Sequence, residues 1–147
     1  MSVTELPQAA PTAALYTEIQ QFYAQQMHLL DDGRVQEWAG TFTQQGVFAA
    51  NAQPVPAVGR EAITKAAQAA TDAYAKAGVQ RRHWLGMVSV EGVTDGAVSA
   101  RCYALVIETP RGGRPEIKAS TLCQDRIVRV DGDWQIEDRQ ITRDDLI

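Results

Sequence analysis

The feature that most constrains the fold of this chain is a change of hydrophobic period at Gly78. Before this glycine, apolar residues recur every three or four positions, as on one face of an amphipathic helix. After it, runs rich in Val, Ile, Tyr and Thr are separated by short turns that contain Gly, which is typical of strands joined by hairpins. Helices followed by an antiparallel sheet predict an α+β fold in which the helices cover one face of the sheet.

Three helices are expected in the first half. Residues 13–30 carry one apolar stripe and end at an Asp-Asp-Gly turn, a short helix is expected over 34–42, and an Ala-rich helix is expected over 59–77. Between the last two, residues 47–50 form a candidate edge strand and residues 51–58 a loop that contains Pro. The helical layer is therefore complete before the main sheet begins.

Four long strands are expected in the second half, over residues 82–91, 97–108, 117–130 and 134–142. In the first of them, simple alternation places Trp84, Val88 and Val90 on one face and Leu85 and Met87 on the other. Both faces are thus largely apolar, which predicts that one lines a pocket and the other meets a second copy of the chain. A homodimer packed through the outer sheet face is expected. The alternative is a modest apolar patch in contact with solvent.

Length and composition are those of an ordinary folded domain. The chain has 147 residues, of which 45% are hydrophobic and 22% charged. We expect a flexible leader over residues 1–12, where Pro, Gln and Thr are frequent, and a single domain over 13–147. Cys102 and Cys123 are expected to be two buried thiols rather than a disulfide, because the chain has neither a CxxC motif nor further cysteines.

Charge and hydropathy exclude several classes of partner. The formal charge of −4 and the absence of a basic cluster argue against nucleic-acid binding, which depends on Lys and Arg at phosphates. The longest apolar run is far shorter than the ~20 residues that span a bilayer, and the first 15 residues contain no basic residue to begin a secretory signal. No membrane association and a cytoplasmic location are expected.

Five separated landmarks occur in an order that resembles a known superfamily. They are Leu30-Asp31-Asp32-Gly33 at the end of the first helix, Trp38 and Phe42 before Gly46-Val47-Phe48, the segment Gly59-Arg60-Glu61-Ala62-Ile63, the pair Arg82-His83, and Asp131-Gly132-Asp133-Trp134 before Arg139. Together they resemble the nuclear transport factor 2-like superfamily, and within it the SnoaL-like polyketide cyclases and scytalone dehydratase-like proteins. The resemblance implies a cone-shaped, curved sheet around a pocket whose mouth is covered by the helices, with subunits paired through the outer sheet face.

His83 is the first candidate catalytic residue. It is one of only two histidines, and it lies at the start of a strand on the same face as Leu85, where a neutral imidazole can act as a general base. The resemblance also places a pocket histidine at this position. The structural alternative is a core histidine bonded to a backbone carbonyl. His28, on the first helix, is expected to be partly exposed and without a role.

Asp31 is the second candidate. It lies on the inward stripe of the first helix, whereas Asp32 lies off that stripe. An inward carboxylate near His83 would fix the tautomer of the imidazole and stabilise its charged form. The resemblance places an aspartate at this helix end. The alternative is a solvated turn with both carboxylates in water.

Other residues are candidates for binding a flat substrate or for structure. Asp125 and Arg139 match a paired aspartate and arginine of the superfamily on its last strands and are expected to form a cross-strand ion pair. The candidate substrate-binding residues are Tyr23, Trp38, Phe48, Met87, Tyr103 and Thr121. No nucleotide, phosphate-loop, zinc-protease or serine-hydrolase motif occurs, and the few His and Cys residues are widely spaced, so no cofactor and no metal are expected.

Together with these candidate residues, the resemblance implies a small-molecule enzyme. The expected activity is that of a cofactor-independent lyase that removes a proton α to a carbonyl of a polyketide-like cyclic ketone or alcohol and then eliminates water or closes a ring. An isomerase that uses the same two residues is an alternative. A non-catalytic small subunit of an oxygenase-type complex is another, because the superfamily includes such subunits.

Overall fold

The computed structural model describes residues 11–147. The helices are α1 (Ala13–Asp31), α2 (Val35–Ala39) and α3 (Arg60–Ala77). The strands are β1 (Phe42–Ala50), β2 (Ala57–Val58), β3 (Val79–Thr94), β4 (Ala97–Pro110), β5 (Glu116–Val130) and β6 (Asp133–Arg143), and a short 3-10 helix follows over Asp144–Leu146. The leader that the sequence predicts falls mostly on residues 1–10, which lie outside the described residues.

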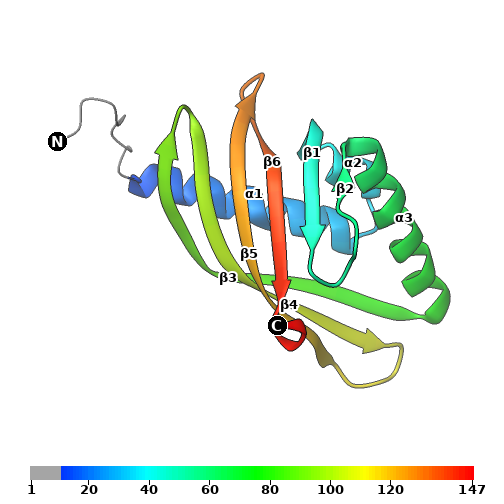
Figure 1. Ribbon diagram of the computed structural model, residues 1–147. Helices are drawn as coiled ribbons and strands as arrows, with labels where there is room; N and C mark the ends of the chain where they lie inside the picture. The colour runs from blue at the N-terminus through cyan, green and yellow to red at the C-terminus, as the bar shows by residue number, and fades with distance from the viewer. Residues whose placement is uncertain (1–10) are drawn as a thin grey trace.

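The strands form one mixed sheet in the order β2-β1-β6-β5-β4-β3. All neighbours are antiparallel except β1 and β6, which are parallel. Figure 1 shows a curved sheet with α1 lying across one face and α3 beside β1 and β2. The α+β class and the curved sheet under three helices are therefore confirmed.

The first strand differs from its prediction. It begins at Phe42 rather than at residue 47, and it lies between β2 and β6 instead of at an edge. The helix before it ends at Ala39, not at residue 42, because Phe42 is fully buried opposite Ile136 in the sheet. The partner strand β6 is far away in the sequence, so no local pattern indicates this pairing.

Helix α1 delivers Asp31 to the sheet. The Thr12 hydroxyl accepts a hydrogen bond from the Leu15 amide at 3.0 Å and caps the start of the helix. Two backbone bonds close its end, from Asp32 N to His28 O at 2.9 Å and from Gly33 N to Leu30 O at 3.1 Å. Gly33 then adopts a φ of 78°, which glycine tolerates without steric cost. The last helical turn therefore ends with Asp31 next to the sheet.

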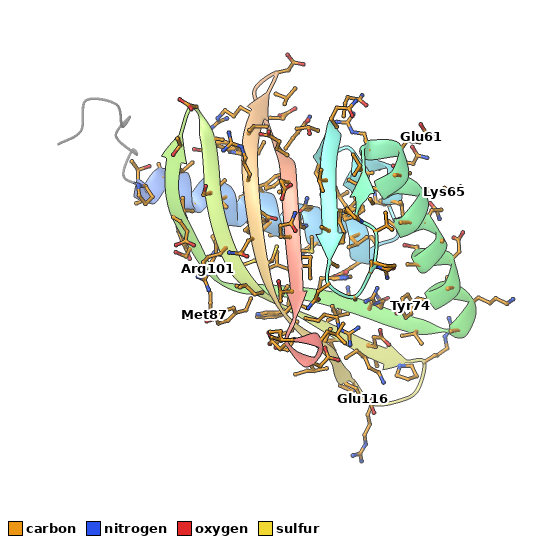
Figure 2. All side chains as sticks on the ribbon, viewed as in Figure 1. Glu61, Lys65, Tyr74, Met87, Arg101 and Glu116 are labelled. Carbon is orange, nitrogen blue, oxygen red and sulfur yellow. The ribbon has the colours of Figure 1, made fainter. Side chains whose placement is uncertain are left out.

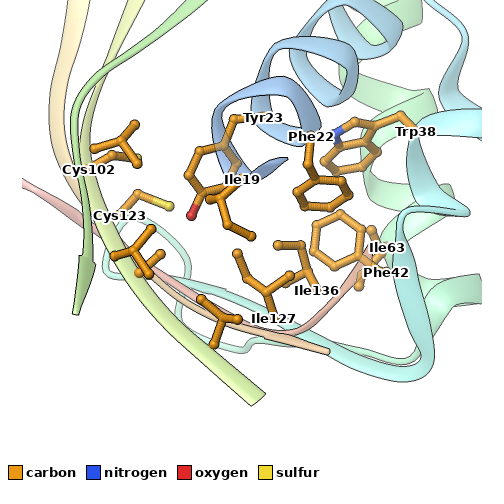
Figure 3. Packing of buried hydrophobic residues seen from close by; sticks show 14 of the residues in the cluster. Ile19, Phe22, Tyr23, Trp38, Phe42, Ile63, Cys102, Cys123, Ile127 and Ile136 are labelled. Atoms are coloured by element: carbon orange, nitrogen blue, oxygen red, sulfur yellow. The ribbon is translucent and has the colours of Figure 1, made fainter. Parts of the chain in front are cut away.

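Helix α1 and the sheet share one hydrophobic core (Figure 3). Trp38 packs edge-on against Phe42 with ring centroids 5.0 Å apart, and the Ile side chains of β5 and β6 fill the space beneath them. The largest fully buried apolar members are Ile19, Tyr23, Phe42, Ile63, Ile127 and Ile136. Burial of a large apolar side chain contributes about 1.5–3 kcal/mol, so this cluster fixes the helices on the sheet.

Strand β3 contains a bulge between Gly86 and Ser89. Its register with β4 shifts there, and Met87 adopts a φ of 53° in the left-handed region. An extra residue in one strand inverts the alternation of side chains beyond it, because successive residues point to opposite faces. The faces of β3 are therefore exchanged from Gly86 to Val90, where the register shifts a second time.

This inversion corrects the predicted faces of β3. Val88 and Val90 are buried in the core, and Met87 is 77% exposed, so the expectation that Met87 shares the face of Leu85 is wrong. Trp84 precedes the bulge and is 66% exposed, on the outer face as predicted. Met87 and Arg101 project from the same side of β3 and β4 (Figure 2), where both line a shallow groove.

Two further predictions concern cysteines and the membrane. Cys102 and Cys123 face each other across β4 and β5, and both are buried free thiols, as expected.

Along residues 11–147, none of the helices is long and apolar enough to cross a membrane.

Candidate functional site

A cavity of about 890 Å³ lies between the helices and the inner face of the sheet. Its walls are mainly apolar, and they come from all three helices α1, α2 and α3 and from the strands β1, β2, β3, β4, β5 and β6. The apolar lining includes Met27, Leu30, Trp38, Phe48, Ile63, Leu85, Val106 and Ile141. A cavity of this size and character is typical of a site for a small organic molecule.

Asp31 and His83 meet on the wall of this cavity. Asp31 Oδ1 lies 2.6 Å from His83 Nδ1, and Asp31 Oδ2 accepts a hydrogen bond from the His83 backbone amide at 3.0 Å. The side chains are only 8% and 16% exposed. Both oxygens of one carboxylate thus hold one residue of β3, and the predicted juxtaposition of the two candidates is present.

This geometry determines which ring nitrogen of His83 is available. An ionised carboxylate can only accept hydrogen bonds, so Nδ1 must donate to Asp31. The lone pair is then on Nε2, the nitrogen that can remove a proton from a ligand. If Nε2 takes up that proton, the imidazolium lies against the negative charge of Asp31 and is stabilised by it. The pair has the arrangement of a general base with its positioning carboxylate.

Three of the six candidate substrate-binding residues line the cavity. They are Trp38, Phe48 and Thr121, whose hydroxyl donates to Ala104 O at 2.9 Å. Trp38 is 4% exposed and also belongs to the hydrophobic core. The aromatic side chains provide a flat apolar wall.

The other three candidates lie elsewhere. Met87 and Tyr103 are on the outer face of the sheet, 77% and 53% exposed, so the expectation that they line the cavity is wrong. The bulge accounts for Met87, and Tyr103 faces outward because its neighbours Cys102 and Ala104 face inward. Tyr23 is buried beside the cavity rather than on its wall, and Figure 3 shows its hydroxyl directed toward the strand that carries Cys123.

Tyr23 belongs to a buried polar network centred on Asp125. The Tyr23 hydroxyl donates to Asp125 Oδ2 at 2.6 Å, while Arg139 Nε and Nη2 donate to the two carboxylate oxygens at 2.9 and 3.0 Å. Arg139 Nη2 also donates to Gln26 Oε1 at 2.8 Å. The predicted cross-strand ion pair is thus confirmed, with side chains that are 3% and 0% exposed.

Burial shifts the proton affinities of this network. The pKa of Tyr23 lies well above its usual value because the phenol is buried and faces the Asp125 carboxylate. Burial alone would lower the pKa of Arg139, but the adjacent carboxylate outweighs it and the pKa is raised. The Cys123 thiol has a raised pKa because it hydrogen-bonds to Cys102 and is buried. Arg139 therefore stays charged, and Tyr23 and Cys123 stay neutral, near neutral pH.

Sequence reasoning missed two members of the site. Gln26 is fully buried on α1. Its position, one turn beyond Tyr23 on the inward stripe of the helix, is the sequence signal that could have indicated a buried hydrogen-bond partner. Arg139 was predicted only as a structural ion-pair member, yet it also lines the cavity. In the part of the chain that the structure describes, no three His, Cys, Asp or Glu residues are grouped so as to hold a metal ion.

The chain was compared with known protein families. Residues 11–140 match the family described as SnoaL-like domain. A search of curated proteins gave no match.

Several solved structures are similar over nearly the whole chain. Aln2 from a Streptomyces species is 37% identical, with 94% of this chain and 96% of that chain covered and a TM-score of 0.86. ActVI-ORFA from Streptomyces coelicolor is 31% identical, with coverage of 90% and 97% and a TM-score of 0.83. A protein from Catenulispora acidiphila in complex with S-DNPA is 38% identical, with coverage of 91% and 96% and a TM-score of 0.80.

More distant structures share the fold alone. An NTF2-like protein with a cystatin-like fold from Novosphingobium aromaticivorans is 22% identical, with a TM-score of 0.76. A protein from the same organism, provisionally named the beta subunit of an aromatic-ring-hydroxylating dioxygenase, is also 22% identical, with a TM-score of 0.72.

Proposed function

Because the chain belongs to the SnoaL-like domain family, we propose that it is a cofactor-independent lyase that acts on a flat, polyketide-like cyclic ketone or alcohol. The observation that carries this proposal is the contact of 2.6 Å between Asp31 and His83 on the wall of an apolar cavity of about 890 Å³. The ligand-bound Catenulispora acidiphila relative supports a small molecule as the partner.

The reaction begins with proton transfer to His83. Nε2 removes a proton from the carbon next to a substrate carbonyl, and the C–H electron pair forms an enolate. The Asp31 carboxylate stabilises the imidazolium meanwhile. The enolate then expels a hydroxyl group from the β-carbon, and the imidazolium returns its proton to that group, so that water leaves. If a second carbonyl is in reach, the enolate carbon attacks it instead, the C=O π electrons move to its oxygen, and the resulting alkoxide takes the proton back from His83 Nε2, so that a ring closes.

The alternative of an isomerase uses the same first step. The proton on Nε2 would then return to a different carbon of the substrate, which moves a double bond without loss of water. A non-catalytic subunit, by contrast, needs no base in its cavity. The buried Asp31–His83 contact favours the catalytic alternatives, because it holds an imidazole lone pair ready in an apolar space.

Deuterium exchange tests the first step without the natural substrate. The α-protons of 1-tetralone, a flat bicyclic ketone, are followed by proton NMR in D₂O with and without the protein. We expect exchange above the buffer rate, and a loss of about 10²–10⁴-fold in His83→Ala, the range typical of general base catalysis. Asp31→Asn should also lower the rate, and the double variant should be little worse than His83→Ala because the two residues act as one unit.

Two variants near the end of α1 serve as matched controls. His28→Ala removes the other histidine, and Asp32→Asn removes the carboxylate next to Asp31. His28 is exposed and lies outside the cavity lining, whereas Asp32 is an exposed residue at the edge of the lining that does not bond to His83. Exchange should stay near the wild-type rate in both variants. Full exchange in a folded His83→Ala protein would reject the assigned base. Exchange at the buffer rate in the wild type, despite binding of the ketone, would favour the non-catalytic alternative.

We also propose that the protein is a homodimer joined through the outer face of the sheet. Trp84, Met87 and Tyr103 are exposed there around a groove of about 530 Å³. Exposed aromatic and Met side chains are enriched at protein interfaces. The inner face of the same sheet is occupied by the helices and the cavity, so the outer face is the one left for a second copy.

A further inference from the structure

Arg139 combines features that the ion pair alone does not require. It is 3% exposed, it is held from two sides by Asp125 and Gln26, and it is nevertheless part of the cavity lining. Its guanidinium also lies near the rings of Tyr23 and Phe42, with its carbon 5.8 and 5.6 Å from their centroids. The side chain is therefore fixed in place, as a residue that orients a ligand must be.

One nitrogen of Arg139 is left for a ligand. Nε and Nη2 donate to Asp125, and Nη2 also donates to Gln26. Among residues 11–147, nothing accepts a hydrogen bond from Nη1. Because the rest of the guanidinium is engaged in the network, Nη1 is the donor that remains for the cavity.

Arg139 and His83 lie toward different ends of the cavity. His83 is paired with Val106 of β4. Arg139 is paired with Asp125 of β5, which is itself paired with Ala100 of β4. The step from Val106 to Ala100 corresponds to about 20 Å along the strand at roughly 3.3 Å per residue. The residues of β6 that line the cavity are Arg139, Ile141 and Arg143. Arg139 is the one nearest the hydrophobic core, so it marks the inner end of the cavity.

We propose that Arg139 is a specificity-determining residue, whose Nη1 donates a hydrogen bond to a carbonyl or phenol oxygen on the part of the substrate remote from the reacting carbon. This inference rests on the proposed function and names the substrate more closely: a flat, elongated polycyclic molecule with oxygens at both ends. The oxygen is a neutral one, because Asp125 already balances the charge of Arg139.

The energetics favour an oxygen at this place. If a ligand covers Arg139 Nη1 without offering an acceptor, this donor loses its hydrogen bonds to water and forms none in their place. A hydrogen bond between a charged group and a ligand oxygen, by contrast, is among the stronger ones. Sites built in this way discriminate strongly against analogues that lack the oxygen. An apolar ring system without it should therefore bind poorly, even though most of the cavity is apolar.

Two ligands of nearly equal shape test the inference. 9-Fluorenone accepts a hydrogen bond through its carbonyl, and fluorene lacks that oxygen; neither ligand has a proton α to a carbonyl that His83 could remove. Dissociation constants are measured with the full chain from the quenching of tryptophan fluorescence. We expect 9-fluorenone to bind about tenfold tighter or more. In Arg139→Lys this advantage should fall to twofold or less, because lysine pairs with Asp125 but lacks the rigid third nitrogen.

A matched substitution and a second variant make the test decisive. Arg126→Lys changes an exposed arginine of β5 that pairs with Glu137, and it should keep the full advantage. If Arg139→Lys does not fold, the double variant Asp125→Leu with Arg139→Met replaces the pair by apolar side chains, an exchange that other proteins tolerate, and it should abolish the advantage. Equal affinity for both ligands in the wild type, or an advantage that persists in these variants, would overturn the inference.

The result is separable from that of the proton-exchange experiment. Ligand binding is measured without turnover, so a preference for 9-fluorenone that depends on Arg139 supports the inference even if no exchange occurs. Exchange that depends on His83, without any preference for the oxygen, supports the proposed reaction and rejects the role of Arg139.

Discussion

Asp125→Asn is the substitution that most directly tests how the buried network stabilises the fold. It changes one oxygen for a nitrogen of similar size and removes one negative charge. Asp125 is fully buried and accepts hydrogen bonds from Arg139 through both oxygens and from Tyr23 at 2.6 Å. An asparagine at this position retains one acceptor oxygen, and its amide would face a donor. Arg139 would remain charged, 3% exposed and without its counter-charge.

The expected loss of unfolding free energy is about 3–5 kcal/mol, the range found when one partner of a buried ion pair is removed. This is a large part of the roughly 5–15 kcal/mol by which domains are stable. Glu37→Gln provides the comparison: it breaks a contact of 2.6 Å with Arg34, but both side chains are 56% exposed. Such surface pairs contribute about 0–1 kcal/mol, so the two substitutions should differ severalfold in their effect.

Urea unfolding followed by tryptophan fluorescence measures both losses. The double variant Asp125→Leu with Arg139→Met should be more stable than Asp125→Asn alone, because it leaves no unpaired charge in the core. A loss below about 1 kcal/mol in Asp125→Asn would refute the argument that the orphaned charge is costly. If the double variant is as unstable as the single one, the cost lies in the lost hydrogen bonds instead.

Three further outcomes are expected. Trp84→Glu with Tyr103→Glu should give a monomer in light scattering, whereas Val58→Glu, an exposed apolar site on β2, should not; a wild-type monomer would reject the dimer. Because the pKa of Tyr23 is raised by burial and by Asp125, its contribution to stability is complete below about pH 10 and is lost as the pH rises above it. Tyr23→Phe should therefore flatten the alkaline part of a stability profile measured by urea unfolding. Met87→Gly should raise the unfolding free energy by up to about 1 kcal/mol and Met87→Val should lower it, since Met87 has a φ of 53°; equal stability would show that the bulge is unstrained.

The helices and the placement of Asp31 and His83 follow from local patterns. The apolar stripe of α1 predicts its inward face, and the Asp-Asp-Gly turn predicts its end, so the position of Asp31 could be derived before the structure. His83 precedes the bulge of β3, and its face was therefore predicted correctly. Both residues lie where periodicity is uninterrupted, which is the condition for such a prediction.

The face of Met87 could not be predicted from alternation. A left-handed backbone at a methionine has no sequence signature, and the adjacent Gly86 is only a weak indication of a bulge. The prediction that Tyr23 lines the cavity was wrong for another reason. Tyr23 does lie on the inward stripe of α1, but its hydroxyl donates a hydrogen bond to Asp125, a residue 102 positions away. Whether an inward aromatic residue lines a cavity or closes the core depends on such distant contacts.

The parallel pairing of β1 with β6 has a consequence for how the chain is synthesised. Phe48 is opposite Arg139 in this ladder, so β1 leaves the ribosome about 90 residues before its partner strand exists. At roughly 5–20 residues per second, this interval lasts about 5–20 s. During it, the backbone groups of β1 that later bond to β6 have only water or a chaperone as partners, because β2 pairs with the opposite edge of β1. Completion of the sheet, and of the cavity that it encloses, must therefore wait for the last strand.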